Sequence, residues 1–132
     1  MKTKFVLFLV LFLAVIVSIK GHHAFAAEFD VNKEVKLEGT MTKIEWFNPH
    51  IWIYLDVKEN GSLVKWQCEG GAPNSLTRNG WTRDALKSGD VITIDGYLAK
   101  DGSKTCNARS IMLPGGKRVF AGSSAPEATN TK

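Results

Sequence analysis

The sequence predicts an all-β fold and, among all-β folds, a five-stranded OB-like Greek-key barrel. Five segments alternate apolar and polar residues with the period of two that a half-buried strand requires. One short helical connection is expected between the third and fourth segments, which is the element order of an OB barrel. A small open β-sandwich has strands of similar length and is the alternative.

Residues 1–21 are predicted to be a signal peptide that does not belong to the fold. Lys2 and Lys4 form a short basic head, and an uncharged apolar run of fifteen residues extends from Phe5 to Ile19. A helix needs ~20 such residues to cross a bilayer, so an uncleaved membrane anchor is the less favoured alternative. We therefore expect the domain to be periplasmic or secreted and to meet the membrane only during export.

Two cleavage points fit the preference of signal peptidases for small residues. A cut after Gly21 would start the mature chain at His22, whereas a cut after Ala26 would discard both nearby histidines. The mature chain is predicted to comprise a lead-in segment (22–34), the OB-like barrel (35–120) and a disordered tail (121–132) whose residues are small and polar.

Removal of the signal peptide also changes the charge of the molecule. It takes away three lysines and no acid, which lowers the formal net charge from +4 to +1. Nucleic-acid binding depends on clustered excess Lys and Arg, so nucleic acid is not an expected partner. The remaining length is that of one domain with a modest core.

The first strand is predicted over Val35–Trp46, after a turn at Val31–Lys33. Gly39 inside this strand predicts a bulge or a tight bend. Asn48-Pro49 then makes a stiff corner, because proline fixes its own φ and restricts the residue before it.

The second strand alternates without interruption from Ile51 to Val57. The side chains expected to face the core are Ile51, Ile53, Leu55 and Val57. Trp52 and Tyr54 are expected on the outer face, with His50 at the entrance of the strand.

The later elements are separated by turn residues. Asn60-Gly61 supplies the positive φ of a tight hairpin turn. The elements expected after it are a strand at Ser62–Cys68, a helical turn at Asn74–Arg78, strands at Asp90–Tyr97 and Thr105–Leu113, and a brief pairing at Val119–Phe120. Trp81 is expected to close one end of the core.

The chain has two cysteines, Cys68 and Cys106, and we expect them to form a disulfide in an exported protein. Free thiols and a metal-thiolate pair are the alternatives. The metal alternative is the weaker one, because the two residues lack the close spacing of thiolate sites.

The three histidines, His22, His23 and His50, are the candidate metal ligands. If the mature chain starts at His22, its free amine and ring nitrogen chelate one ion together, and His23 or His50 completes the site. Such nitrogen coordination favours Cu(II), so copper is the expected cofactor if there is one. The alternative is that His22 and His23 are cleavage-site residues and that His50 caps the Asn48-Pro49 turn.

Trp52, Tyr54 and Trp46 form a second candidate site, for a ligand or partner. The outer face of the second and third strands is the usual binding surface of an OB barrel. Aromatic faces there can stack on a sugar ring or a peptide, although local packing is the alternative. The expected partners are thus a metal ion, an envelope protein or a glycan, and a structural role in an envelope complex is a third possibility.

Catalytic motifs are absent from the sequence. It has no Gly-x-Ser-x-Gly elbow, no glycine-rich phosphate loop and no His-Glu-x-x-His motif. We therefore expect that the protein is not an enzyme.

Several of these motifs together resemble those of a family of small exported bacterial proteins of unknown function. The matching segments are His22–Asp30, Gly39–Thr40, Glu45–Trp46, Asn48–His50, Ala72–Asn74, Gly80–Thr82 and Asn107–Ser110. Members of that family typically read His-His-Ser-Phe where this chain has His-His-Ala-Phe. The resemblance covers His22–Phe120 and implies a periplasmic, OB-like domain. It implies no established activity, and it says nothing about the two cysteines.

Overall fold

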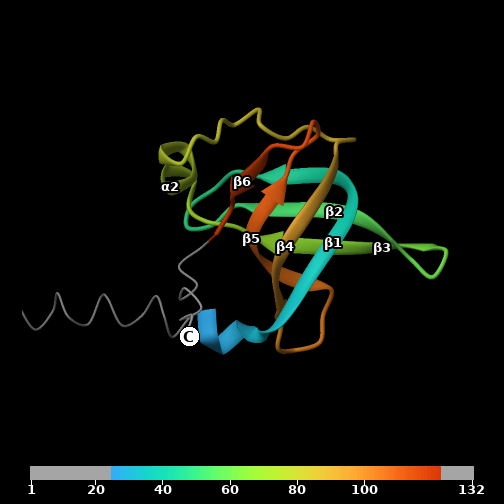
Figure 1. Ribbon diagram of the computed structural model, residues 1–132. Helices are drawn as coiled ribbons and strands as arrows, with labels where there is room; N and C mark the ends of the chain where they lie inside the picture. Colours follow the sequence, from blue (N-terminus) through green and yellow to red (C-terminus); the bar gives the residue numbers. More distant parts are fainter. Residues whose placement is uncertain (1–24, 123–132) are drawn as a thin grey trace, which may run out of the picture.

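The computed structural model describes residues 25–122 (Figure 1). The predicted signal peptide and residues 123–132 of the predicted tail lie outside this range. The elements are β1 (Phe29–Glu45), β2 (Trp52–Glu59), β3 (Ser62–Glu69), α2 (Pro73–Arg78), β4 (Val91–Ala99), β5 (Thr105–Met112) and β6 (Arg118–Phe120). Residues 25–28, immediately before β1, are helical. No helix among the described residues combines the length and apolar character needed to cross a bilayer.

The strands close into a ring, which confirms the predicted all-β, OB-like architecture. β1 pairs antiparallel with both β2 and β4, while β2 pairs with β3 and β4 with β5. A parallel pairing of β3 with β5 completes the ring β1-β2-β3-β5-β4. β6 pairs with β5 outside the ring, as the brief sixth pairing predicted. Because the ring is closed, the open sandwich is excluded.

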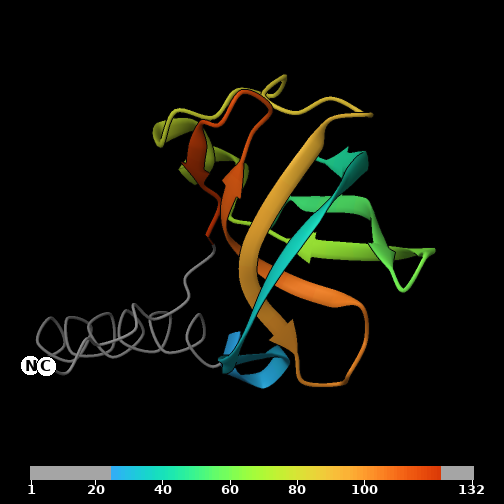
Figure 2. The ribbon, with the colours of Figure 1, turned by 45° about the vertical axis from the view of Figure 1, so that its right-hand side comes forward.

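β1 serves two neighbours because it bends around the ring (Figure 2). Gly39 lies where β1 pairs with β2 and β4 at once. A Cβ at this position would lie 2.6 Å from the carbonyl oxygen of Asp56, so only glycine fits. The register irregularity predicted for this strand follows just after it, between Met41 and Lys43.

The start of β1 differs from the prediction. The turn expected at Val31–Lys33 is wrong, because these residues belong to the strand, although their pairing with β4 is irregular. Phe29 is buried and packs with Phe25 and Tyr97 in a small cluster outside the main core. This apolar contact holds the start of the strand against β4, and the polar sequence after Phe29 does not reveal it.

The main core lies inside the ring. The apolar side of β2 is buried as predicted, through Ile53, Leu55 and Val57. Ile51, which directly precedes β2, is buried as well. Trp81 is buried at the end of the core beside α2, and its indole N–H donates to the carbonyl oxygen of Phe120 at 2.7 Å. Ala121 is also buried, and its N–H donates to the carbonyl oxygen of Arg109. The prediction of a disordered tail is therefore wrong for Ala121.

Cys68 and Cys106 form the predicted disulfide. They lie directly opposite each other in the parallel pairing of β3 with β5, and both are fully buried. The bond therefore crosses the seam at which the ring closes. The free-thiol and metal-thiolate alternatives are excluded.

Candidate functional site

A cleft of about 750 Å³ lies on the outer face of the ring, and Trp52 contributes to its lining. We call it the Trp52 cleft. Its lining residues come from the helical stretch before β1, from each of the five ring strands, and from the turn between β4 and β5: Ala27, Glu28, Phe29, Trp52, Gln67, Ala99, Lys100, Asp101, Ser103 and Thr105. All five strands of the ring, the helical stretch and one turn therefore build one hollow.

The strand pairings bring the floor of the Trp52 cleft together. Trp52 is half-buried on β2, one step diagonally from Gln67 on the adjacent β3. Gln67 lies directly opposite Thr105 in the parallel pairing, and its amide Nε2 donates to the threonine Oγ1 at 3.2 Å. The Trp52 side chain thus lines the same cleft as an amide and a hydroxyl that are oriented by their mutual hydrogen bond.

The walls of the cleft are the segment 27–29 and the β4–β5 turn, which lie together at one end of the ring (Figure 2). The backbone N–H of Lys100 donates to the carbonyl oxygen of Glu28 at 2.8 Å, and the Lys100 ammonium group donates to the carbonyl oxygen of Ala26. In the turn, Asp101 accepts a hydrogen bond from the backbone N–H of Ser103 at 2.9 Å. The two hydrogen bonds that Lys100 donates join the two walls.

An aromatic cluster beneath these walls holds the first wall in place. Phe25 is 7% exposed, and its ring centroid lies 5.6 Å from that of Phe29 and 5.8 Å from that of Tyr97. Because Phe25 and Phe29 flank residues 26–28, their burial fixes that helical stretch beside the cleft.

Only one of the three predicted aromatic residues lies in the Trp52 cleft. Tyr54 donates its hydroxyl to Glu45 at 3.1 Å and lies beneath the Lys43 ammonium group, 5.1 Å from the ring centroid. It borders a separate hollow of about 250 Å³. Trp46 packs on Trp81, with 6.1 Å between ring centroids, so it supports the core.

The predicted metal ligands fall into two groups. His22 and His23 lie outside the described residues. His50 is at the rim of the ring, with its side chain 36% exposed. Its Nδ1 lies 3.1 Å from the carbonyl oxygen of Gly70 and 3.4 Å from the carboxylate of Glu69. Within residues 25–122, no three His, Cys, Asp or Glu side chains form a group that could hold a metal ion.

Glu69, beside His50, has a shifted pKa. Burial raises the pKa of its carboxyl group, and the negative charge of Glu28 raises it further. Protonated His50 opposes this shift. Glu28, which lines the Trp52 cleft, is therefore close enough to Glu69 for its charge to act there.

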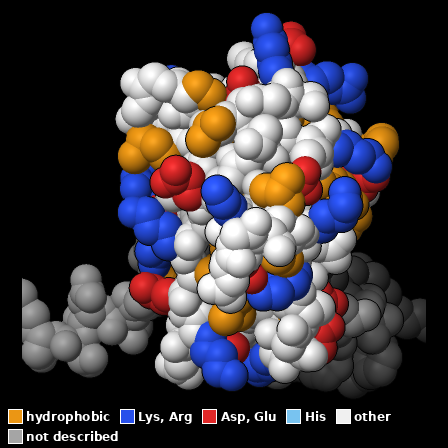
Figure 3. Space-filling view, turned by 90° about the vertical axis from the view of Figure 1, so that its right-hand side faces the viewer, with side chains coloured by type: hydrophobic (Ala, Val, Ile, Leu, Met, Phe, Trp, Pro, Cys, Tyr) orange, Lys and Arg blue, Asp and Glu red, His pale blue; other side chains and the backbone are white. Residues whose placement is uncertain are grey.

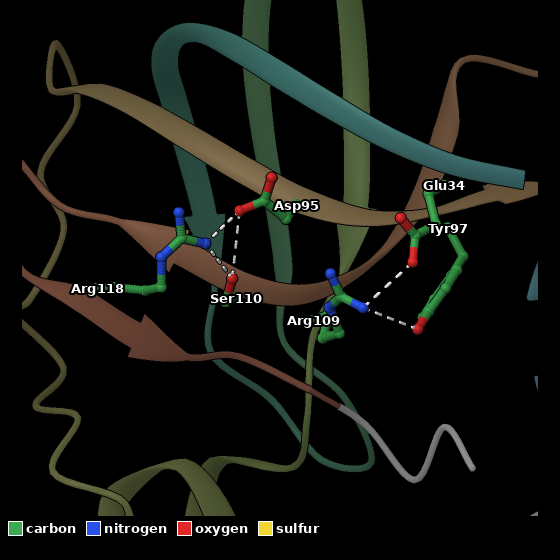
Figure 4. Close-up of polar contacts among 6 residues, drawn as sticks. All are labelled: Glu34, Asp95, Tyr97, Arg109, Ser110 and Arg118. Carbon is green, nitrogen blue, oxygen red and sulfur yellow. Dashed lines mark hydrogen bonds and ion pairs between the residues drawn. The ribbon is translucent and has the colours of Figure 1, made fainter. Parts of the chain in front are cut away.

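A second outer surface, across β1, β4, β5 and β6, carries paired charges (Figure 4). We call it the charged face, and its residues are Glu34, Asp95, Tyr97, Arg109, Ser110 and Arg118. Arg118 reaches from β6 to the Asp95 carboxylate and to the Ser110 hydroxyl, the latter at 2.7 Å. Arg109 donates to Glu34 and to the Tyr97 hydroxyl, each at 3.3 Å.

Basic and acidic side chains are also interspersed on the side of the molecule that carries the β2–β3 hairpin (Figure 3). Glu59 near the hairpin tip pairs with Lys104 at 2.9 Å and accepts the indole N–H of Trp66 at 2.7 Å. These two bonds lower the pKa of Glu59. Charges of both signs therefore lie close together on this side.

Sequence reasoning missed most of the Trp52 cleft. Gln67 and Thr105 gave no signal, because they meet only through the parallel pairing of β3 with β5. The segment Lys100–Gly102 was recognisable as a turn. Its position opposite residues 27–29 was not, because the contact joins distant parts of the chain.

A model of a family of unknown function, DUF6152, matches residues 11–108 of the chain. This range includes every residue that lines the Trp52 cleft. Searches against curated proteins and against solved structures found no match.

Proposed function

The chain belongs to this family of unknown function, DUF6152, and we propose that it is an exported, non-catalytic binding module whose ligand contacts Trp52. The observation that carries the proposal is the Trp52 cleft itself. Its volume of about 750 Å³ falls in the usual range for ligand sites, and its lining combines one half-buried aromatic side chain with several polar ones. The outer face of the second and third strands is also where OB barrels usually bind.

The disulfide supports the exported location of this module. A buried bond between Cys68 and Cys106 is compatible with an oxidising compartment such as the periplasm. The resemblance of the His-His-Ala-Phe and Asn-Pro-His segments to exported bacterial proteins points the same way.

The test is an NMR titration of the ¹⁵N-labelled protein with two panels, neutral oligosaccharides and short uncharged peptides. We expect at least one panel member to shift the Trp52 indole N–H signal. The same ligand should shift the backbone N–H signals of Gln67 and Thr105, and Trp52→Ala, which has no indole signal of its own, should abolish these backbone shifts. Tyr54→Ala is the matched control, because Tyr54 lies on the same side of β2 but outside the cleft. Absence of any Trp52-dependent response to both panels would overturn the proposal.

A nitrogen-ligated copper site at His50 is the second candidate, and the orientation of its ring favours it. With Nδ1 directed at the carbonyl oxygen of Gly70, the proton belongs on Nδ1 and the lone pair on Nε2. Metal-bound histidines commonly donate their other ring N–H to a carbonyl or carboxylate in this way. The His50 side chain is also partly exposed.

The remaining ligands of this copper site would be His22 and His23, and the packing of Phe25 bears on whether they survive export. A cut after Ala26 would remove Phe25, which is buried against Phe29 and Tyr97. It would also remove the carbonyl oxygen that accepts the Lys100 ammonium hydrogen bond. We therefore propose the cut after Gly21, which keeps both histidines and starts the mature chain at His22.

Two measurements test the copper candidate. N-terminal sequencing of the exported protein should read His-His-Ala-Phe, and Cu(II) titration of His50→Ala should show weaker binding than the wild type. Asn48→Ala, in the same corner of the chain, is the control. A mature start at Ala27, with copper binding unchanged in His50→Ala, would exclude this candidate.

A further inference from the structure

We infer that the Trp52 cleft takes an uncharged glycan segment, with one sugar ring stacked on the indole of Trp52. This inference rests on the proposed binding function and goes beyond it by naming the class of ligand. It follows from the charge of the cleft, from the state of its main-chain groups, and from the kinds of side chain that its floor presents.

The charges in the cleft do not suit an anionic ligand. Its only cationic side chain, Lys100, directs its ammonium group to the carbonyl oxygen of Ala26, and two carboxylates, Glu28 and Asp101, line the same hollow. Recognition of a phosphate or a carboxylate requires a surplus of Arg or Lys donors. The Trp52 cleft instead has more carboxylates than cationic side chains among its described lining residues.

A cationic ligand is no better matched. The Asp101 carboxylate already accepts hydrogen bonds from the Ser103 hydroxyl and from the Ser103 backbone N–H, which lower the pKa of Asp101 and use part of its capacity for hydrogen bonds. Quaternary or protonated amines are usually held in cages of several aromatic rings. Among the described residues that line the cleft, Trp52 is the one aromatic residue that is not buried, because Phe29 is buried.

The main chain around the cleft does not suit an extended peptide. Peptides commonly bind by adding a strand to an open sheet edge. At the floor, β3 pairs with β2 on one side and with β5 on the other, and the N–H of Gln67 donates to the carbonyl oxygen of Lys104 at 3.1 Å. At the wall, the N–H of Lys100 is bonded to Glu28. The sheet therefore offers no edge here for an added strand.

The remaining groups that could recognise a ligand belong to side chains, and these side chains suit a ligand that carries hydroxyl groups. The Gln67 amide and the Thr105 hydroxyl can each donate and accept, and the Ser103 hydroxyl, which bonds to Asp101, can still accept. The hydrogen bond of 3.2 Å between the Gln67 amide and the Thr105 hydroxyl orients these two groups beside Trp52. A flat apolar plate next to neutral groups that donate and accept matches the two sides of a sugar ring, whose C–H face is apolar and whose rim is hydroxylated.

The test is a titration of the full mature protein with four hexasaccharide probes, followed by ¹⁵N NMR. Three are neutral, namely hexamers of β-1,4-glucose, α-1,4-glucose and β-1,4-N-acetylglucosamine, and the fourth is the anionic hexamer of galacturonic acid. We expect at least one neutral hexamer to shift the Trp52 indole signal together with the backbone signals of Gln67 and Thr105. The anionic hexamer should not shift them.

Variants separate stacking from folding. Trp52→Ala should weaken binding at least tenfold, which corresponds to about 1.4 kcal/mol. Trp52→Phe keeps an aromatic plate and should bind within roughly threefold to fivefold of the wild type. Gln67→Ala should weaken binding about threefold to tenfold, and Tyr54→Ala should not change it. Amide spectra of each variant establish that the fold is retained.

The outcomes distinguish this inference from the proposed function. Trp52-dependent binding of peptides, with none of the neutral hexamers bound, would overturn the glycan assignment and leave the binding module intact. Preferential binding of the galacturonic acid hexamer would overturn the inferred neutrality of the ligand in the same way. No Trp52-dependent response to any sugar or peptide would overturn both.

Discussion

The charged face and the Trp52 cleft are two outer surfaces of the same ring, and they differ in what their polar side chains contact. On the charged face, side chains from β4, β5 and β6 bind one another across the strands (Figure 4). In the cleft, polar side chains surround a half-buried indole and a hollow of about 750 Å³. The alternation of each strand predicts outward side chains on both surfaces. The two surfaces differ because of the segments of the chain that lie beside each of them.

In the part of the chain that the structure describes, such segments form walls beside the Trp52 cleft but not beside the charged face. Residues 27–29 and the β4–β5 turn flank Trp52, and the Phe25–Phe29–Tyr97 cluster holds the first of them down. On the charged face the neighbouring strand β6 pairs with β5 and provides Arg118 as a partner for Asp95. The comparison teaches that a binding surface on this barrel depends on what flanks the sheet, more than on the sheet's own pattern.

Removing the disulfide should have the largest effect, and it should act on the cleft side first. Cys68→Ser combined with Cys106→Ser opens a loop with a sequence separation of 38 and is expected to lower the free energy of unfolding by about 4 kcal/mol. The bond crosses the β3–β5 seam under the Gln67–Thr105 pair. Urea unfolding measures the loss, and hydrogen exchange should accelerate in β3 and β5 before β1 and β4. Equal acceleration in all strands would contradict this account.

Removing the anchor of the cleft wall should have the next largest effect. Phe25→Ala is expected to lower the free energy of unfolding by about 3 kcal/mol, because the side chain is buried against two aromatic rings. Phe47→Ala is the control, since Phe47 is 64% exposed and its truncation should cost less than about 0.5 kcal/mol. Thermal unfolding measures both. A cost for Phe25→Ala as small as that of the control would show that residues 25–28 are not anchored.

The sequence alone predicted those features of the fold that depend on local sequence patterns or on composition. The alternation from Ile51 to Val57 identified which side of β2 faces the core, and Asn60-Gly61 identified the hairpin. The disulfide followed from the count of cysteines and the predicted compartment. Each of these depends on neighbouring residues or on composition, so no long-range pairing had to be known.

The candidate site was only partly predictable, because it depends on contacts between distant segments. The sequence singled out Trp52, but it grouped Tyr54 and Trp46 with it, whereas one borders another hollow and the other packs on Trp81. The walls depend on the closure of β3 onto β5 and on the burial of Phe25 and Phe29. No periodicity within a single strand reports either event.

A smaller effect is expected on the charged face. Arg118→Ala should lower the free energy of unfolding at pH 7 by about 0.5–1 kcal/mol, since the pair is partly exposed. Burial alone would raise the pKa of Asp95, but the Arg118 hydrogen bond and charge hold it below its usual value of 3.8. A lowered carboxyl pKa stabilises the fold above that value, and the stabilisation disappears as the pH falls through the lowered pKa.

Urea unfolding of Arg118→Ala and the wild type between pH 2 and pH 7 checks this prediction. Their difference should be largest near neutrality and should vanish in acid. Lys117→Ala, an exposed neighbour, is the control and should match the wild type throughout. A difference that persists unchanged at low pH would indicate that Arg118 acts through packing of its stem. Binding at Trp52 should be unaffected in either case.

The smallest effect is expected at Glu69, and its pH dependence should run opposite to that of Asp95. Burial and the charge of Glu28 raise the pKa of Glu69 above its usual value of 4.5. A raised carboxyl pKa stabilises the fold below that value, and the stabilisation is lost as the pH rises through the raised pKa. Glu69→Gln stays neutral throughout, so it should exceed the wild type in stability at pH 7, by less than about 0.5 kcal/mol, and match it near pH 4. A variant less stable than the wild type at pH 7 would mean that the attraction of His50 outweighs burial at this position.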